Sequence, residues 1–144
     1  MFEDGRVVQC VPEARRAWHA GVSSWAGETD INSCSIGIEI VNPGHEFGYR
    51  SFPDRQIEAV IELARDIFTR HAIAAARVLG HSDVAPARKL DPGELFPWGT
   101  LALAGVGLWP QTRRLRLTVP FTDGLRAFGY GLRPDMDVPD ETVI

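Results

Sequence analysis

The spacing of apolar residues between positions 53 and 71 predicts one amphipathic helix. These residues recur at intervals of three and four, which places them on a single helical face: Ile57, Val60, Ile61, Ala64, Ile67 and Phe68. Pro53 lies near the expected start, and Ser51 is a candidate cap. We therefore expect a helix over about 53–71 that buries one face against a core.

Alternating and β-branched residues predict short strands elsewhere in the chain. Residues 35–41 (SIGIEIV) have the period of two expected of a strand, and residues 7–11 and 77–80 are shorter candidates. Just before residues 7–11, Asp4-Gly5 predicts a hairpin turn, because this pair readily adopts positive φ angles. Alternation of strands with a helix predicts an α/β fold.

A change of composition after Trp98 divides the chain. We expect a catalytic-type α/β domain over 1–100, a turn-rich linker over 101–117 that contains GVGLWP, and the start of a small helical unit over 118–144. Little of a strand precedes the turn at Asp4, and a helix starting at Pro139 would stop within about a turn. The pattern therefore indicates a piece of a longer protein.

Composition narrows the class of protein. A chain of 144 residues with 44% hydrophobic and 24% charged residues is typical of one globular domain. A net charge of −4 without a basic stripe gives no reason to expect nucleic acid as a partner, and no apolar run approaches the roughly 20 residues of a membrane span. Cys10 and Cys34 are expected to be two thiols rather than a disulfide framework.

Glu39 is the first candidate for chemistry. It lies inside the predicted strand 35–41, on the same face as Gly37, so we expect the glycine to leave space beside the carboxylate. A carboxylate in so apolar a strand lies either at a solvent-facing edge or in a cleft. We favour the cleft and a functional role.

The loop from Gly80 to Gly93 concentrates ionisable residues. His81 follows a short strand, where sites of α/β proteins tend to lie, and Asp91 follows ten residues later. This residue pair suits zinc, which takes three protein ligands and an open fourth position when it is catalytic. Lys89 lies two residues before Asp91, so both side chains would share a side of an extended segment and the lysine could stabilise an oxyanion.

Residues 16–25 (RAWHAGVSSW) form a third cluster. Trp18 and His19 would form one wall of a binding groove, with core packing as the alternative. A serine hydrolase centred on Ser23 or Ser24 fits the residue types but lacks the G-x-S-x-G pattern. That alternative predicts inhibition by serine-reactive reagents and indifference to chelators.

Three motifs together resemble one family. RAWHAGVSSW, SIGIEIVNPG and GHSDVAPARKLDPGELFPW, in this order, resemble the zinc-dependent N-acetylmuramoyl-L-alanine amidases of the amidase-2 group, over about residues 1–110. The resemblance implies the mixed central sheet, flanked by helices, that these enzymes share with peptidoglycan recognition proteins. It implies hydrolysis of the amide between N-acetylmuramic acid and L-alanine, in peptidoglycan or muropeptides. The tail is similar to the peptidoglycan-binding extension of the AmiD-like branch.

The resemblance also implies roles for particular residues. His81 and Asp91 match zinc ligands, Glu39 matches the acid that handles the proton of the attacking water, and Lys89 matches the lysine near the oxyanion. Trp18 and His19 would contact substrate. The family's first histidine ligand belongs to a strand that precedes the turn at Asp4, so we expect this piece alone to bind zinc weakly and to be impaired in catalysis.

A non-catalytic peptidoglycan-binding protein of the same fold is the alternative, although such relatives typically lack the zinc ligands that this chain keeps. We expect a monomer, and we favour the bacterial cell envelope over the cytoplasm as its compartment.

Overall fold

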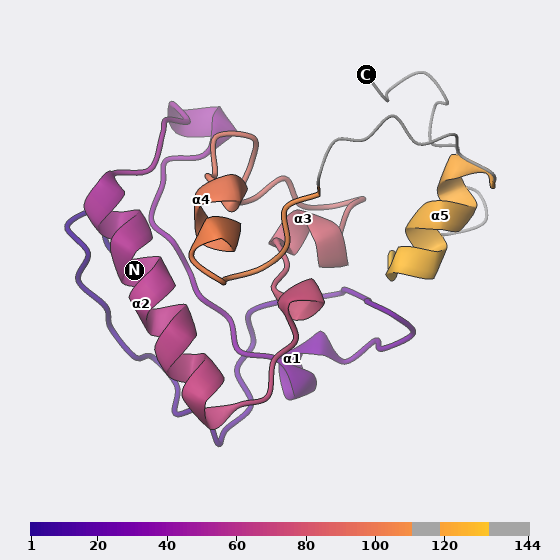
Figure 1. Cartoon of the computed structure of the whole chain (residues 1–144), viewed down its shortest axis with the longest axis horizontal. Helices are drawn as coiled ribbons and strands as arrows, with labels where there is room; N and C mark the ends of the chain where they lie inside the picture. The colour runs from indigo at the N-terminus through magenta and orange to yellow at the C-terminus, as the bar shows by residue number, and fades with distance from the viewer. Residues whose placement is uncertain (111–118, 133–144) are drawn as a thin grey trace.

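The computed structural model describes residues 1–110 and 119–132, which form a set of helices joined by long loops (Figure 1). The helices are α1 (Ile31–Cys34), α2 (Asp54–Arg70), α3 (His81–Val84), α4 (Trp98–Leu103) and α5 (Phe121–Phe128), with 3-10 turns η1 (His45–Phe47) and η2 (Ala75–Arg77). No helix among the described residues is long and apolar enough to cross a membrane. About half of the predicted unit 118–144, including the helix start at Pro139, lies outside the described residues.

Helix α2 confirms the helix predicted from the apolar spacing. Pro53 immediately precedes it, and the helix ends one residue before His71. Its apolar face packs into the larger core, whose buried members are Met1, Phe52, Ile57, Val60, Ala64, Phe96, Leu101 and Val106. The last two lie in the segment predicted as a linker, and both are almost fully buried. Phe96 and Phe52 meet edge to face, with ring centroids 5.1 Å apart.

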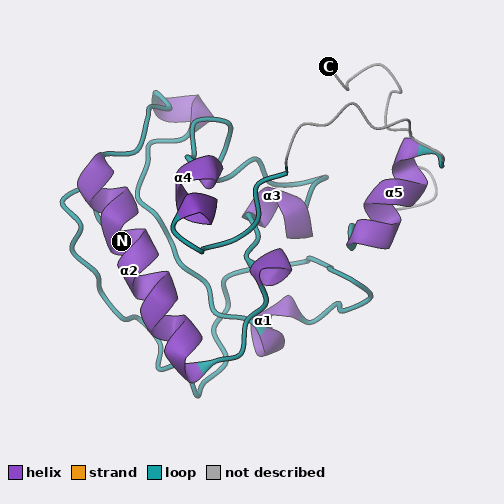
Figure 2. Ribbon diagram, in the orientation of Figure 1, coloured by secondary structure: helices purple, strands orange, loops and turns teal. Residues whose placement is uncertain are grey.

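The predicted central sheet is not formed by the described residues, which contain no strand (Figure 2). Segments 7–11, 35–41 and 77–80 are loops, and η2 occupies part of the last. One rung of parallel pairing is present: the Met1 amino group donates to the Glu39 carbonyl (2.8 Å), and the Val41 N–H donates to the Met1 carbonyl (3.0 Å). A strand needs paired backbone along its length, and a sequence pattern cannot supply the partner.

The hairpin turn predicted at Asp4-Gly5 is present. Gly5 has φ of +84°, and the Phe2 N–H donates to the Arg6 carbonyl (2.9 Å) across the turn. The turn folds the chain start back toward α2 and positions Met1 in the core. It thereby brings Met1 to the segment that carries Glu39.

A second, smaller core lies away from α2. It contains Ala20, Trp25, Ile31 and Val84, with Leu79 and Tyr130 packed against them. Helix α5 lies at this side of the molecule (Figure 1). The Trp25 ring packs edge to face on both Phe128 (5.7 Å) and Tyr130 (4.9 Å).

Candidate active site

The segment predicted as a rigid loop begins with the helical turn α3, and His81 is its first residue. The carboxylate of Asp83 accepts the backbone N–H of Gly80 (2.7 Å), which satisfies a donor that the short helix leaves free. The Ser82 N–H donates to the Asp91 carbonyl (2.9 Å). The two predicted zinc ligands are therefore brought together by backbone contacts as well as by their side chains.

His81 and Asp91 meet directly. Nδ1 of the imidazole lies 3.1 Å from Oδ2 of the carboxylate, and Nε2 lies 3.0 Å from the backbone carbonyl of Ala20. A carbonyl oxygen accepts only, so Nε2 carries a proton and Nδ1 is the nitrogen that faces Asp91. The His81 side chain is 17% exposed and that of Asp91 is 57% exposed, so the pair lies where the inside of the site meets solvent.

Arg88 ties the loop of residues 20–22 to the His81 loop. Its guanidinium donates to the Ala20 carbonyl (2.7 Å) and to the Val22 carbonyl (3.0 Å). The Ala20 carbonyl thus accepts from both Arg88 and His81, which fixes the imidazole relative to the neighbouring loop. Arg88 was not predicted from the sequence, because an arginine in a polar loop has no spacing that marks a backbone contact.

Glu39 and Lys89 line the same cavity as His81 and Asp91. The cavity has a volume of about 810 Å³, within the range of small-molecule sites, and its apolar wall includes Ile38. The four residues that the sequence predicts for catalysis and metal binding thus line one cavity, in which His81 and Asp91 are in direct contact.

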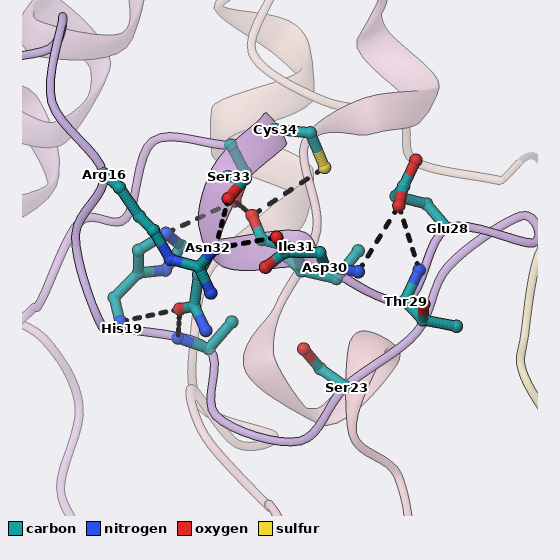
Figure 3. Close-up of polar contacts among 12 residues, drawn as sticks. Arg16, His19, Ser23, Glu28, Thr29, Asp30, Ile31, Asn32, Ser33 and Cys34 are labelled. Carbon is teal, nitrogen blue, oxygen red and sulfur yellow. Dashed lines mark hydrogen bonds and ion pairs between the residues drawn. The ribbon is translucent and has the colours of Figure 1, made fainter.

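His19 also lines this cavity, in a place that corrects one expectation. The space beside Gly37 is filled by the imidazole of His19, since a Cβ at position 37 would lie 2.6 Å from His19 Cγ. Asn32 supports the arrangement, because its Oδ1 accepts the N–H groups of His19 and Ala20, each at 2.9 Å (Figure 3). His19 Nε2 lies 3.3 Å from the hydroxyl of Ser35.

Trp18 is on the outer surface, not in the cavity wall. Its side chain is 82% exposed, and the guanidinium of Arg16 lies 4.3 Å from its ring centroid. Arg16 is held in turn by Asp30 (2.8 Å) and by Ser33 (Figure 3). The predicted wall of Trp18 and His19 is therefore divided between the outside and the inside of the site.

The serine-hydrolase alternative finds no support in the described residues. Ser23 is buried, and its hydroxyl donates to the Gly21 carbonyl (3.2 Å). Neither Ser23 nor Ser24 has a histidine within hydrogen-bond distance there. A nucleophilic serine needs an adjacent base, so this pair does not form a Ser–His site.

Tyr49 supports the other end of the His81–Asp91 segment. Its hydroxyl donates to the Pro92 carbonyl (2.7 Å) and accepts the Leu95 N–H (3.0 Å), and its ring stacks on His45 at 4.3 Å. Burial is the largest cause of a raised pKa for this phenol, which keeps it a hydrogen-bond donor. An isolated tyrosine 42 residues upstream of Asp91 gives no sequence signal for this contact.

The side chains near His81 match zinc in type and not in number. Imidazole nitrogen and carboxylate oxygen are zinc ligands, but a catalytic zinc takes three protein ligands. Among the described residues, no group of three or more histidine, cysteine, aspartate or glutamate side chains is placed to hold a metal ion. His81 and Asp91 alone therefore do not complete a catalytic zinc site.

Comparison with known proteins identifies the family. The family model described as N-acetylmuramoyl-L-alanine amidase matches residues 1–94. The N-acetylmuramoyl-L-alanine amidase AmiD of Escherichia coli K12 is 41% identical over 148 residues, which cover 91% of this chain and 54% of that protein. The 1,6-anhydro-N-acetylmuramyl-L-alanine amidase AmpD of Enterobacter cloacae is 42% identical over 95 residues, covering 66% and 49%.

Solved structures of amidases are also similar to this chain. The complex of Escherichia coli AmiD with anhydro-N-acetylmuramic acid-L-Ala-D-gamma-Glu-L-Lys superposes with a TM-score of 0.81 at 41% identity, covering 92% of this chain and 58% of that one. AmpDh3 of Pseudomonas aeruginosa in complex with anhydromuramic pentapeptide gives a TM-score of 0.82 at 36% identity, with the same coverage of 92% and 58%.

Residues 1–94 match an amidase family model, and the chain superposes on solved amidase structures, so it contains an amidase-type domain. The chain belongs to the N-acetylmuramoyl-L-alanine amidase family. It spans about half the length of the curated relatives it matches.

Proposed function

We propose that this chain supplies the catalytic region of an amidase that hydrolyses the bond between N-acetylmuramic acid and L-alanine. The observation that carries the proposal is the contact of His81 with Asp91 in a cavity that Glu39 and Lys89 also line. Membership of the amidase family and the similarity to two structures with bound anhydromuropeptides support the same substrate class.

Each cavity residue has a task under this proposal. Glu39 accepts a proton from the attacking water and passes it to the leaving amine of L-alanine. The Lys89 ammonium stabilises the negative charge that develops on the amide oxygen. His19 contacts the substrate from the wall formed with Gly37, and Trp18 contacts an outer part of it.

Zinc enters the proposal through His81 and Asp91. Nδ1 of His81 and the Asp91 carboxylate would be two of its ligands, and a third must be added to them before the site is catalytic. A bound zinc ion would supply a water of lowered pKa. The hydrogen bond from Nε2 to the Ala20 carbonyl would orient the imidazole, as outer contacts of metal-binding histidines commonly do.

Incubation of the purified chain with an anhydromuramyl tripeptide tests the activity. Chromatography of the products should detect the free peptide with an L-alanine amino terminus, and a chelator should suppress its release. The Glu39→Gln variant should lose cleavage while still binding the muropeptide, because it keeps the shape of the side chain and removes the base. Cleavage that is equal in Glu39→Gln would overturn the assignment.

A non-catalytic muropeptide-binding protein is the second candidate. The observation that favours it is the two-ligand set, which is short of a catalytic zinc site among the described residues. This candidate predicts saturable binding of the muropeptide with no product, with or without added zinc. Two protein ligands hold zinc weakly, so the amidase proposal predicts slow release of product that increases with added zinc. One assay therefore separates the two candidates.

A further inference from the structure

The segment that follows α5 is fastened to the loop that contains Trp25. The Ala26 N–H donates to the Gly129 carbonyl (2.7 Å), and Tyr130 pairs with Trp25 in an isolated bridge. Gly129 is in close contact with the Trp25 indole, because a Cβ there would stand 2.7 Å from Trp25 Cε2. Its φ of +138° also favours glycine. These contacts fix the position of Tyr130.

From this position the hydroxyl of Tyr130 reaches the His81 turn. It donates to Oδ1 of Asp83 at 2.5 Å, while Oδ2 of the same carboxylate accepts the Gly80 N–H at 2.7 Å. Burial first, and then the neighbouring Asp83 carboxylate, raise the pKa of the Tyr130 phenol far above its usual range. The hydroxyl therefore remains a donor to Asp83 at any ordinary pH.

The carboxylate of Asp83 thus joins two parts of the molecule. On one side it holds the residue that precedes His81, where α3 begins. On the other side it is itself held by a tyrosine whose place is set by Trp25. Without the tyrosine the carboxylate keeps, among the described residues, its bond to Gly80 alone, and its rotamer is free to leave that bond.

We propose that Tyr130 is a positioning residue for the His81–Asp91 pair, acting through Asp83 and the Gly80 N–H. The segment 119–132 then supports the site directly and is more than an attached wall-binding unit. The consequence for catalysis rests on the proposed amidase function, whereas the effect on the His81 turn does not. The hydroxyl of Tyr130 bonds to Asp83, which lies in the same helical turn as His81, so its effect passes through the turn.

Nuclear magnetic resonance of the full 144-residue chain tests the positioning without requiring activity. In Tyr130→Phe, exchange of the Gly80 amide hydrogen should be at least about tenfold faster, because the bond to Asp83 opens more often. The ring nitrogen shifts of His81 should also change, since they report the contacts to Asp91 and to the Ala20 carbonyl. Unchanged Gly80 exchange and unchanged His81 shifts would overturn the proposal.

A matched variant separates positioning from general stability. Phe128→Leu weakens packing on the Trp25 ring and on the Tyr130 ring, whose centroid lies 6.3 Å from that of Phe128, but it keeps the Tyr130 hydroxyl. It should therefore lower the melting temperature and leave both His81 readouts close to those of the parent. Equal changes of the readouts in Phe128→Leu would show that Tyr130 acts only through packing, and would contradict the proposal.

A double-mutant cycle tests whether Tyr130 acts through Asp83. In an Asp83→Ala background, Tyr130→Phe should add no further change to the His81 shifts, because the path through Asp83 is already cut. An additive change would place the action of Tyr130 elsewhere and reject this path. Muropeptide cleavage measured on the same variants then tests the amidase proposal separately, since its absence leaves the magnetic resonance results interpretable.

Discussion

The imidazole of His19 occupies the space that a side chain at Gly37 would fill. A Cβ on Gly37 would lie 2.6 Å from both Cγ and Nδ1 of His19, far inside contact distance. The φ of Gly37 is outside the left-handed region, so the glycine is needed for closeness and not for backbone freedom. The missing side chain of Gly37 thus leaves the space in which the His19 ring is held in the cavity wall.

Gly37→Ala should displace His19 from the cavity wall. Overpacking of this kind typically costs about 1–3 kcal/mol of stability, and the muropeptide should bind more weakly because its wall has moved. Titration calorimetry and denaturant unfolding measure the two effects. Gly124→Ala in α5 is the control, since a Cβ there meets nothing within 4 Å and alanine favours a helix over glycine. Unaltered binding by Gly37→Ala would contradict the role given to His19.

Arg88→Ala should loosen the loop of residues 20–22 from the His81 loop. Two charge-assisted hydrogen bonds to backbone carbonyls are lost, each of a kind worth about 1.5–3 kcal/mol before relaxation. Thermal unfolding should show the loss, and Arg88→Lys should recover part of it by reaching one of the carbonyls. For Arg55 the structure gives no side-chain hydrogen bond within the described residues, so Arg55→Ala should change little. Equal melting temperatures for the Arg88 and Arg55 variants would refute this account.

Gln56→Leu should destabilise the segment that carries Glu39. Gln56 is fully buried in α2, and its Nε2 donates to the Val41 carbonyl (2.8 Å). The variant leaves that carbonyl without this donor, at a cost of about 1–3 kcal/mol in urea unfolding. Gln56→Glu should cost more, because it also buries a charge. A stable Gln56→Glu variant would show that water reaches this position.

Glu13 predicts a pH dependence of stability. Hydrogen bonds from Arg70, followed by His71, lower the pKa of this carboxyl from 4.5 to about 2. A lowered pKa in the folded state adds stability above the unfolded pKa and loses it as the pH falls toward 2. Thermal unfolding should therefore find Glu13→Gln less stable than the parent above pH 4.5 and equal to it near pH 2. A difference that persisted at the low end would point to another cause.

Local rules account for the parts of the fold that the sequence predicted correctly. The helix α2 follows from a single-face apolar repeat and a preceding proline, and the turn at Asp4-Gly5 follows from glycine's access to positive φ. The predicted central sheet is not present among the described residues. Pairing of strands is a contact between distant segments, and the period of 35–41 says nothing about which backbone lies beside it.

The candidate site likewise contains residues that local sequence patterns predicted and residues that they did not. Residue type and loop placement singled out His81, Lys89 and Asp91, and a place in a predicted strand singled out Glu39; all four line one cavity. Arg88, Tyr49 and Tyr130 were missed, because they act through hydrogen bonds to residues 43 to 68 positions away. No local pattern marks such contacts. The imidazole on Gly37 was likewise invisible, since the glycine alone suggests empty space and not what fills it.

Calorimetric titration of the chain with zinc tests most directly the claim that His81 and Asp91 form one metal-binding pair. The account predicts that His81→Ala and Asp91→Ala each weaken zinc binding by at least about tenfold, and that the double variant is little weaker than either. Lys89→Met, in the same cavity, should bind zinc as the parent does. Zinc affinity that survives both single substitutions, or a parent chain that binds no zinc, would contradict the claim.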